Sequence, residues 1–198
     1  MINNGQFKKL EALMLIDEFL PEFDFEEKHS IAIDADADAA TVYEAAQNAN
    51  LGESWIVRML LTLRGMSADA LTVRNLRYSK FRILGERPAS ELLIGLAGEF
   101  WTPWGDLQDV NAENFKAFDK SGYAKAVWNF SLDADGPNGK ATRLTTETRI
   151  KCLDDGSRRR FGFYWTFVQP FSGLIRMEML KTIKSKAELS EPPAIAGV

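Results

Sequence analysis

The feature that most constrains the fold is a pair of adjacent segments in which apolar and polar residues alternate. Residues 123–132 and residues 142–152 both show this alternation, and the turn-forming residues 135–139 separate them. A period of two places successive side chains on opposite faces of a strand, so each segment has one apolar and one polar face. The two segments are therefore predicted to be strands of an antiparallel sheet that buries one face.

Other segments add strands and helices to this sheet. A strand pattern covers residues 27–34, and residues 81–85 and 91–101 are predicted to form a hairpin. Helical spacing of apolar residues predicts helices over residues 1–20, from about 39 to 46, over 51–64 and over 172–188. Residues 157–169 fit either a helix or a strand. Their aromatic residues and the arginines at positions 158–160 favour a strand, because basic residues at a helix start oppose its dipole.

The composition narrows the class of protein. The chain has 198 residues, 45% of them hydrophobic and 26% charged, which excludes disordered, fibrous and membrane-embedded classes. Its net charge of −4 argues against nucleic acid as a partner. The single cysteine excludes an internal disulfide and suits a reducing compartment. With no apolar run long enough for a signal peptide or a membrane span, we expect a cytoplasmic protein without integral membrane association.

The order of these elements, together with three local segments, resembles the START-like helix-grip superfamily, also called SRPBCC or polyketide cyclase/dehydrase-like. The segments are Ile31–Tyr43, Thr142–Arg149 and Pro170–Arg176. The resemblance implies an α+β fold in which a curved antiparallel sheet wraps around a long C-terminal helix, with two short helices after the first strand. Residues 1–25 are expected to be a helical extension packed on the domain, 26–190 a single helix-grip domain, and 191–198 a flexible tail.

Members of that superfamily commonly hold a lipid, sterol, polyketide or hormone-sized ligand between the sheet and the last helix. The resemblance thus implies binding of a small hydrophobic ligand. It carries over no catalytic residue and implies no cofactor or metal, and the oligomeric state stays open. The alternation directs several side chains of the second half toward one interior. The residues expected around the cavity are Glu99, Trp101, Trp128, Phe130, Thr146, Thr148, Tyr164, Trp165 and Ile175.

Two other classes of function fit the same residues. An enzyme of the cyclase or dehydrase kind could use Glu99, Tyr164 or Thr146 as its polar group in the same cavity. A protein-interaction domain would instead fill the cavity with its own aromatic side chains. Whether the protein is an enzyme therefore stays undecided. Buried convergent polar groups would favour the enzyme, and an interior without a cavity would favour the interaction domain.

Three shorter patterns are better explained by structure than by chemistry. Asp34, Asp36 and Asp38 imitate the start of a calcium loop, but the later positions that need glycine and a bidentate acid are alanines. The glycine-containing stretch 136–140 lacks the spacing of a phosphate loop and predicts a turn. His29 and Cys152 could form a nucleophile–base pair, although a lone strand cysteine is usually a small hydrophobic residue.

Overall fold

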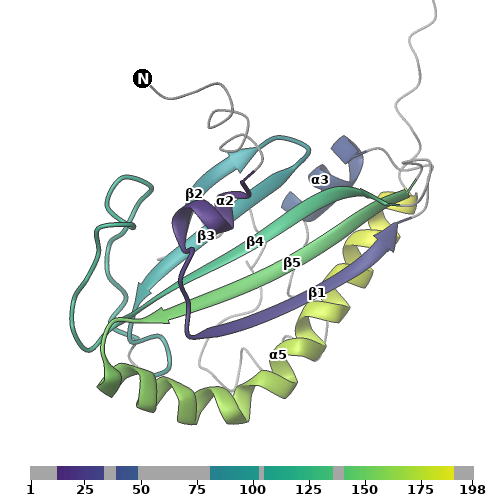
Figure 1. The fold of residues 1–198 in the computed structure, drawn as a ribbon. Helices are drawn as coiled ribbons and strands as arrows, with labels where there is room; N and C mark the ends of the chain where they lie inside the picture. The colour runs from purple at the N-terminus through teal and green to yellow at the C-terminus, as the bar shows by residue number, and fades with distance from the viewer. Residues whose placement is uncertain (1–12, 34–38, 49–80, 103–104, 136–140, 190–198) are drawn as a thin grey trace, which may run out of the picture.

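The computed structural model describes residues 13–33, 39–48, 81–102, 105–135 and 141–189, which form an antiparallel sheet with helices on both faces (Figure 1). This is the predicted α+β helix-grip architecture. The sheet is curved, and a long C-terminal helix runs along one side of it. The elements in chain order are α2 (Leu15–Phe19), β1 (Phe25–Ile33), α3 (Ala39–Gln47), β2 (Arg82–Arg87), β3 (Glu91–Gly98), β4 (Ala124–Asp135), β5 (Ala141–Cys152) and α5 (Asp155–Leu189).

The five strands lie in the order β1-β5-β4-β3-β2, and every neighbouring pair is antiparallel. The two alternating segments are neighbours, as predicted, with Trp128 of β4 opposite Thr148 of β5. On the other side of β5, Glu27 of β1 lies opposite the same threonine. Directly opposite residues share a face of the sheet. Glu27, Thr148 and Trp128 therefore form a row across three strands on one face.

That face carries the main apolar core, which is closed by α3 and the C-terminal half of α5. Leu180 and Ile183 of α5 are fully buried there, as is Leu144 of β5. Each buried aliphatic side chain of this kind contributes about 1.5–3 kcal/mol by leaving water. The other buried members are Ile33, Val42, Tyr43, Ala46, Leu92, Ile94, Phe130, Met179 and Ala187.

The opposite face of the sheet is covered by α2 and by the segment that precedes β4. Leu15, Ile16 and Phe19 of α2 pack in a second core that also contains Phe115. Glu91 of β3 is 2% exposed and accepts hydrogen bonds from the backbone N–H groups of Leu15 and Ile16, at 2.6 and 3.2 Å. These are N–H groups of the first turn, which lack partners within a helix, so the carboxylate fixes α2 on the sheet.

The preference for a strand over residues 157–169 is wrong, because these residues belong to α5. The helix begins with a reciprocal cap: Ser157 N–H donates to Asp154 Oδ1 at 2.8 Å, and Asp154 N–H donates to Ser157 Oγ at 3.2 Å. The arginines near the start are offset by acidic partners, Asp24 for Arg158 and Glu99 for Arg160. Helical geometry buries Phe161 and leaves Phe163 72% exposed, whereas a strand would have placed both on one face.

Pro170, which could have started the last helix or kinked a longer one, lies inside α5. Figure 1 shows that α5 changes direction along its length as it follows the sheet, and a proline within a helix is a common cause of bending. The apolar stripe predicted for residues 172–188 is only partly buried. Leu180 is 0% exposed, whereas Leu174 is 54% exposed and faces outward.

Several predictions concern residues outside the described ranges. These are the helix at 51–64, most of the helix at 1–20, the aspartates of 34–38, the turn at 136–140 and the tail after 190. The expected division of the chain into extension, domain and tail stays a prediction. Among the helices that the structure describes, none combines the length and the apolar character needed to cross a bilayer.

Candidate functional site

The structure distributes the nine predicted cavity residues over separate places along the interface of the sheet with α5. Phe130 is buried in the main core, and Ile175 lies half-buried on the middle of α5. Trp128, Thr146 and Thr148 lie together on the sheet face beneath α5. Trp101, Tyr164 and Trp165 belong to a cluster at the first turns of α5, with Glu99 on its outer side. These positions do not test whether the residues contact a ligand, so the cavity assignment stays a prediction.

The aromatic cluster consists of Phe25, Phe100, Trp101, Phe161, Tyr164 and Trp165. Phe161 is its centre, with ring centroids 5.0 Å from Phe25, 5.8 Å from Trp101 and 5.6 Å from Trp165. Tilted and edge-to-face contacts at these separations are favourable. The cluster therefore anchors the N-terminal part of α5 to the strands. The indole Nε1 of Trp101 is buried there without a hydrogen-bond partner.

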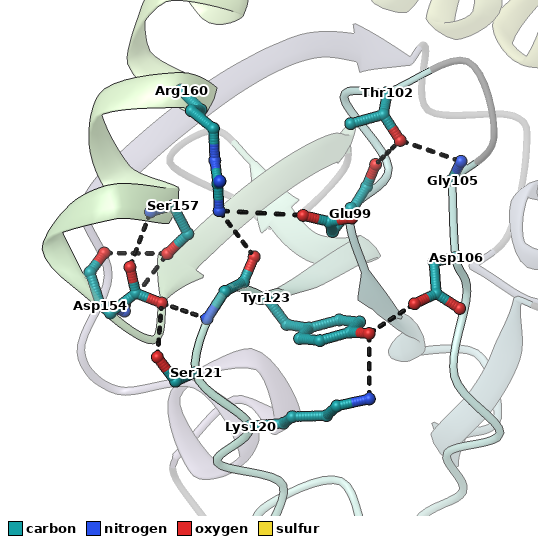
Figure 2. Close-up of polar contacts among 11 residues, drawn as sticks. Glu99, Thr102, Gly105, Asp106, Lys120, Ser121, Tyr123, Asp154, Ser157 and Arg160 are labelled. Carbon is teal, nitrogen blue, oxygen red and sulfur yellow. Dashed lines mark hydrogen bonds and ion pairs between the residues drawn. The ribbon is translucent and has the colours of Figure 1, made fainter.

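Glu99 lies where the end of β3 meets the beginning of α5 (Figure 2). Its Oε1 is 3.8 Å from a terminal nitrogen of Arg160, and its side chain is 32% exposed. In the same region Asp154 accepts hydrogen bonds from the N–H groups of Gly122 and Ser157, which lower the pKa of Asp154 to about 2. These contacts hold the loop before β4 against the helix start. The surroundings of Glu99 in the described structure are therefore charged and partly exposed.

The middle of α5 differs from both of its ends. Phe161 is buried before this part, and Met179 and Leu180 are buried after it, yet none of residues 162–178 is buried. At 1.5 Å per residue this stretch covers about 25 Å of helix. The helix is thus anchored by buried apolar side chains at two places, and the side chains between them are half-buried or exposed.

A polar cluster joins this stretch of α5 to β1, and it consists of Glu27, His29, Ser172 and Arg176. Glu27 is only 8% exposed and accepts hydrogen bonds from Ser172 Oγ at 2.6 Å and from His29 Nε2 at 3.0 Å. Arg176 Nε lies 3.3 Å from Glu27 Oε2 and 3.3 Å from Ser172 Oγ. Burial lowers the pKa of Arg176, and the neighbouring Glu27 opposes this effect.

Gly173 allows the helix backbone to approach this cluster closely. A β-carbon at this position would lie 3.3 Å from Glu27 Oε1 and 3.5 Å from two atoms of the His29 ring. A methyl group there would touch the imidazole and would require the Glu27 carboxylate to shift by a few tenths of an ångström, so larger side chains fit less well. The absence of a side chain at Gly173 brings Ser172 and Arg176 within hydrogen-bonding distance of β1.

The residues beside the polar cluster differ in how well their polar atoms are satisfied. Thr146 Oγ1 accepts from Trp128 Nε1 at 2.6 Å and donates to the carbonyl of Asn129 at 2.9 Å. Thr148 is 8% exposed, and its hydroxyl is buried without a partner among the residues that the structure describes. The guanidinium carbon of Arg176 lies 6.0 Å from the centroid of the Trp128 ring. The row Glu27, Thr148, Trp128 thus has Arg176 in contact with both of its ends.

The polar cluster was missed by sequence reasoning, which took His29 only as a partner for Cys152. The available signal was that Glu27 and His29 share the inward face of a strand with Ile31 and Ile33. Polar residues on an apolar strand face need partners, which β5 alone does not supply. Ser172 and Arg176 are four residues apart, so they share a side of α5. No local pattern linked them to β1, which is about 145 residues earlier in the chain.

The chemistry open to the cluster is proton transfer or binding of a polar group, and serine nucleophilicity is not supported. In a Ser-His-acid triad the hydroxyl donates to the imidazole, whereas Ser172 donates to the carboxylate of Glu27. The pair of His29 and Cys152 is not supported either. His29 lies opposite Thr146, six residues from Cys152 along β5, or about 20 Å at the rise of a strand. Burial raises the pKa of Cys152 to about 12, so its thiol stays protonated.

An open groove of about 440 Å³ lies between β1 and the last turns of α5. Its lining includes Ile31, Lys181 and Glu188, and none of the nine predicted cavity residues. Among the described residues, no three His, Cys, Asp or Glu side chains are grouped as a metal ion would require.

Known proteins with a similar arrangement differ widely from this chain in sequence. No protein-family model matches it, and no curated protein matches it. Solved structures with a similar arrangement include the hypothetical protein jhp0584 from Helicobacter pylori, with 8% identity, a TM-score of 0.40 and coverage of 86% of this chain and 93% of that one. The similar solved structures named in this section all have TM-scores below 0.5.

Two of the similar solved structures are aromatase/cyclases. The di-domain ARO/CYC BexL from the BE-7585A biosynthetic pathway is 13% identical, with a TM-score of 0.36 and coverage of 94% of this chain and 58% of that one. The Zhui aromatase/cyclase from Streptomyces sp. R1128 is 14% identical, with a TM-score of 0.29 and coverage of 88% and 99%.

Proposed function

We propose that the protein binds a small, largely apolar molecule between the sheet and the middle of α5. The observation that carries this proposal is the stretch 162–178, which contains no buried residue and lies between two buried anchors of the same helix. Natural helices that cover a sheet bury a residue about every turn. Five turns without a buried residue are the arrangement expected where an occupant other than side chains completes the interior.

The walls of this space suit an apolar ligand with one polar group. Trp128, Val168 and Ile175 are half-buried and offer apolar surface. The polar cluster and the unpartnered Thr148 hydroxyl are confined to one region of the space. Binding sites for small molecules are typically apolar with a few fixed polar groups.

Native mass spectrometry of the purified protein tests the proposal directly. We expect a retained mass of a few hundred daltons that is lost on denaturation, or uptake of an added apolar probe such as 1-anilinonaphthalene. Val168 lies seven residues after Phe161 and four before Ser172, so Val168→Trp should fill the space and reduce probe binding. Gln169→Trp places the same side chain on an exposed position and is the matched control.

A failure to bind any apolar probe would contradict this function. An interior that takes up no ligand, in a protein of unchanged stability, would instead favour a protein-interaction domain. Equal effects of Val168→Trp and Gln169→Trp would show that the probe binds elsewhere on the protein.

A second candidate is a cyclase- or dehydrase-type enzyme that acts on an apolar substrate in the same space. The hydrogen bond of Glu27 to His29 favours it, since a carboxylate that holds an imidazole is a common arrangement for a general base. The His29 side chain is 27% exposed and therefore accessible to a substrate. A planar apolar probe, 5-nitrobenzisoxazole, tests for such a base, because removal of its ring C–H proton opens the N–O bond to a coloured phenolate.

The expected result for the enzyme is probe turnover above the rate in buffer that is lost in His29→Gln but kept in Cys152→Ser. Turnover that is unaffected by His29→Gln would contradict a role for the histidine. Probe binding without turnover would leave binding as the function.

A further inference from the structure

Two side chains at the row Glu27, Thr148, Trp128 have hydrogen-bond donors without a partner among the described residues, and these are Arg176 and Thr148. Within the described part of the chain, hydrogen bonds reach the Arg176 guanidinium only at Nε, from the side of Glu27 and Ser172. Its two terminal nitrogens carry four further N–H donors. The Arg176 side chain is 14% exposed, so it is nearly enclosed but still accessible to a small molecule.

Thr148 supplies a second unused donor at the same place. Its residue is 8% exposed, and its Oγ1 is buried with no partner. Most buried hydroxyl groups in proteins have a hydrogen-bond partner, so an unpartnered one needs an explanation. Thr146, two residues earlier on the same face, makes two hydrogen bonds through its own Oγ1. The lack of a partner is thus a property of position 148 and not of this face of the sheet.

The geometry brings the two donors to one side of an aromatic ring. Thr148 lies directly between Glu27 and Trp128 in the strand register. Arg176 contacts Glu27 at one end of this row, and its guanidinium carbon is 6.0 Å from the Trp128 ring centroid at the other end. The hydrogen bond from Trp128 Nε1 to Thr146 fixes the indole in place. Arg176 therefore reaches from the Glu27 end of this row to the Trp128 end, and Thr148 lies between the two ends.

We propose that Arg176 and Thr148 bind an oxygen acceptor of the ligand, and that the ligand is an apolar molecule that carries a carboxylate or a similarly charged oxygen. This inference rests on the proposed binding of an apolar molecule and names its polar group. The charge of Arg176 favours an anionic oxygen, because charge-assisted hydrogen bonds are about twice as strong as neutral ones. Glu27 keeps Arg176 in place from the opposite side, so the carboxylate is a positioning residue.

The test compares two probes of the same shape, 2-naphthoate and naphthalene, by isothermal titration calorimetry. The wild-type protein should bind 2-naphthoate at least about tenfold more tightly than naphthalene. Thr148→Val removes a hydroxyl that has no partner in the protein and keeps the shape of the side chain. It should leave the thermal midpoint unchanged or raised, while weakening 2-naphthoate about tenfold and leaving naphthalene unchanged.

Ser131→Ala is the matched control. Ser131 is 3% exposed and has an unpartnered buried hydroxyl, as Thr148 does, but it alternates with Phe130 and so lies on the opposite face of the sheet. This variant should match Thr148→Val in stability and leave the binding of both probes unchanged. Arg176→Lys keeps a positive charge beside Glu27 and should also weaken 2-naphthoate, because a lysine cannot present two parallel donors.

The outcomes separate the two proposals. Similar affinities for both probes, with no effect of Thr148→Val, would overturn the acceptor site and leave the binding of apolar molecules standing. Binding of neither probe by the wild-type protein would contradict both. Equal losses of 2-naphthoate binding in Thr148→Val and Ser131→Ala would also overturn the inference, since the second residue faces away from the site.

Discussion

Removal of Arg176 should show how strongly the stability of the protein depends on the positive charge beside the Glu27 carboxylate. Arg176→Met keeps the length of the stem but leaves a carboxylate whose side chain is 6% exposed without its cation. Breaking a buried ion pair by removing one partner costs about 3–5 kcal/mol. Ser172 and His29 still donate to Glu27, so the lower value, about 3 kcal/mol, is expected.

The double variant Glu27→Gln/Arg176→Met decides whether the cost comes from the unpaired charge. An amide at position 27 can keep the hydrogen bonds without a net charge, so the double variant should be more stable than Arg176→Met alone. We expect it to recover about 2 kcal/mol, because replacing both partners of a buried pair is far less costly than removing one.

Urea unfolding followed by circular dichroism measures these free energies of unfolding. For a chain of this size, about 3 kcal/mol corresponds to a fall of about 6–12 °C in Tm. Lys116→Met is the matched control. Lys116 pairs with Glu18 at 2.8 Å, but both side chains are more than 40% exposed, so its loss should cost less than about 1 kcal/mol. A cost below about 1 kcal/mol for Arg176→Met, or costs that simply add in the double variant, would refute the reasoning.

Three further predictions test the anchors of α5 and the chemistry of its surroundings. Leu180→Asp buries a charge at a position with 0% exposure and should cost several kcal/mol, whereas Leu174→Asp, at 54% exposure, should change the urea midpoint little; equal midpoints would contradict the orientation of the helix. The hydrogen bonds from Gly122 and Ser157 lower the pKa of Asp154 from 3.8 to about 2, so their contribution to stability is present above pH 4 and is lost as the pH falls toward 2. Asp154→Asn should therefore reduce the pH dependence of unfolding between pH 2 and 4, and an unchanged profile would argue against this assignment. Burial raises the pKa of Cys152 to about 12, so iodoacetamide at pH 8 should label the folded protein at least about a hundredfold more slowly than the unfolded chain; comparable rates would show that the thiol is accessible.

The sequence alone was sufficient to predict the strands of the sheet and the C-terminal part of α5. The alternation in residues 123–132 and 142–152 predicted β4 and β5 as neighbours, and the apolar spacing after Ser172 predicted the last helix. These predictions held because a period of two or of 3.6 is a local property that each segment carries by itself. The order of these segments also predicted the helix-grip arrangement, since one long helix has one sheet to cover.

The local pattern could not decide whether residues 157–169 form a helix or a strand, because the same aromatic residues fit both a period of 3.6 and a period of two. The structure selects a helix through contacts with distant residues. Asp24 pairs with Arg158 and Glu99 with Arg160, and Phe25 and Trp101 pack on Phe161. These acidic and aromatic partners offset the unfavourable arginines at the helix start. They lie far from α5 in the sequence, so a local pattern of residues within the helix does not include them.

The polar cluster depends on tertiary structure in the same way. Glu27 and His29 are recognisable from sequence only as polar residues on an apolar strand face, and Ser172 and Arg176 only as polar residues of a helix. Their meeting requires the register of β1 on β5, the course of α5 across the sheet, and the close approach that Gly173 allows. Periodicity determines which face a side chain takes along its own element. The residue that it meets across the interior depends on how separate elements pack, and this is decided only when the whole chain has folded.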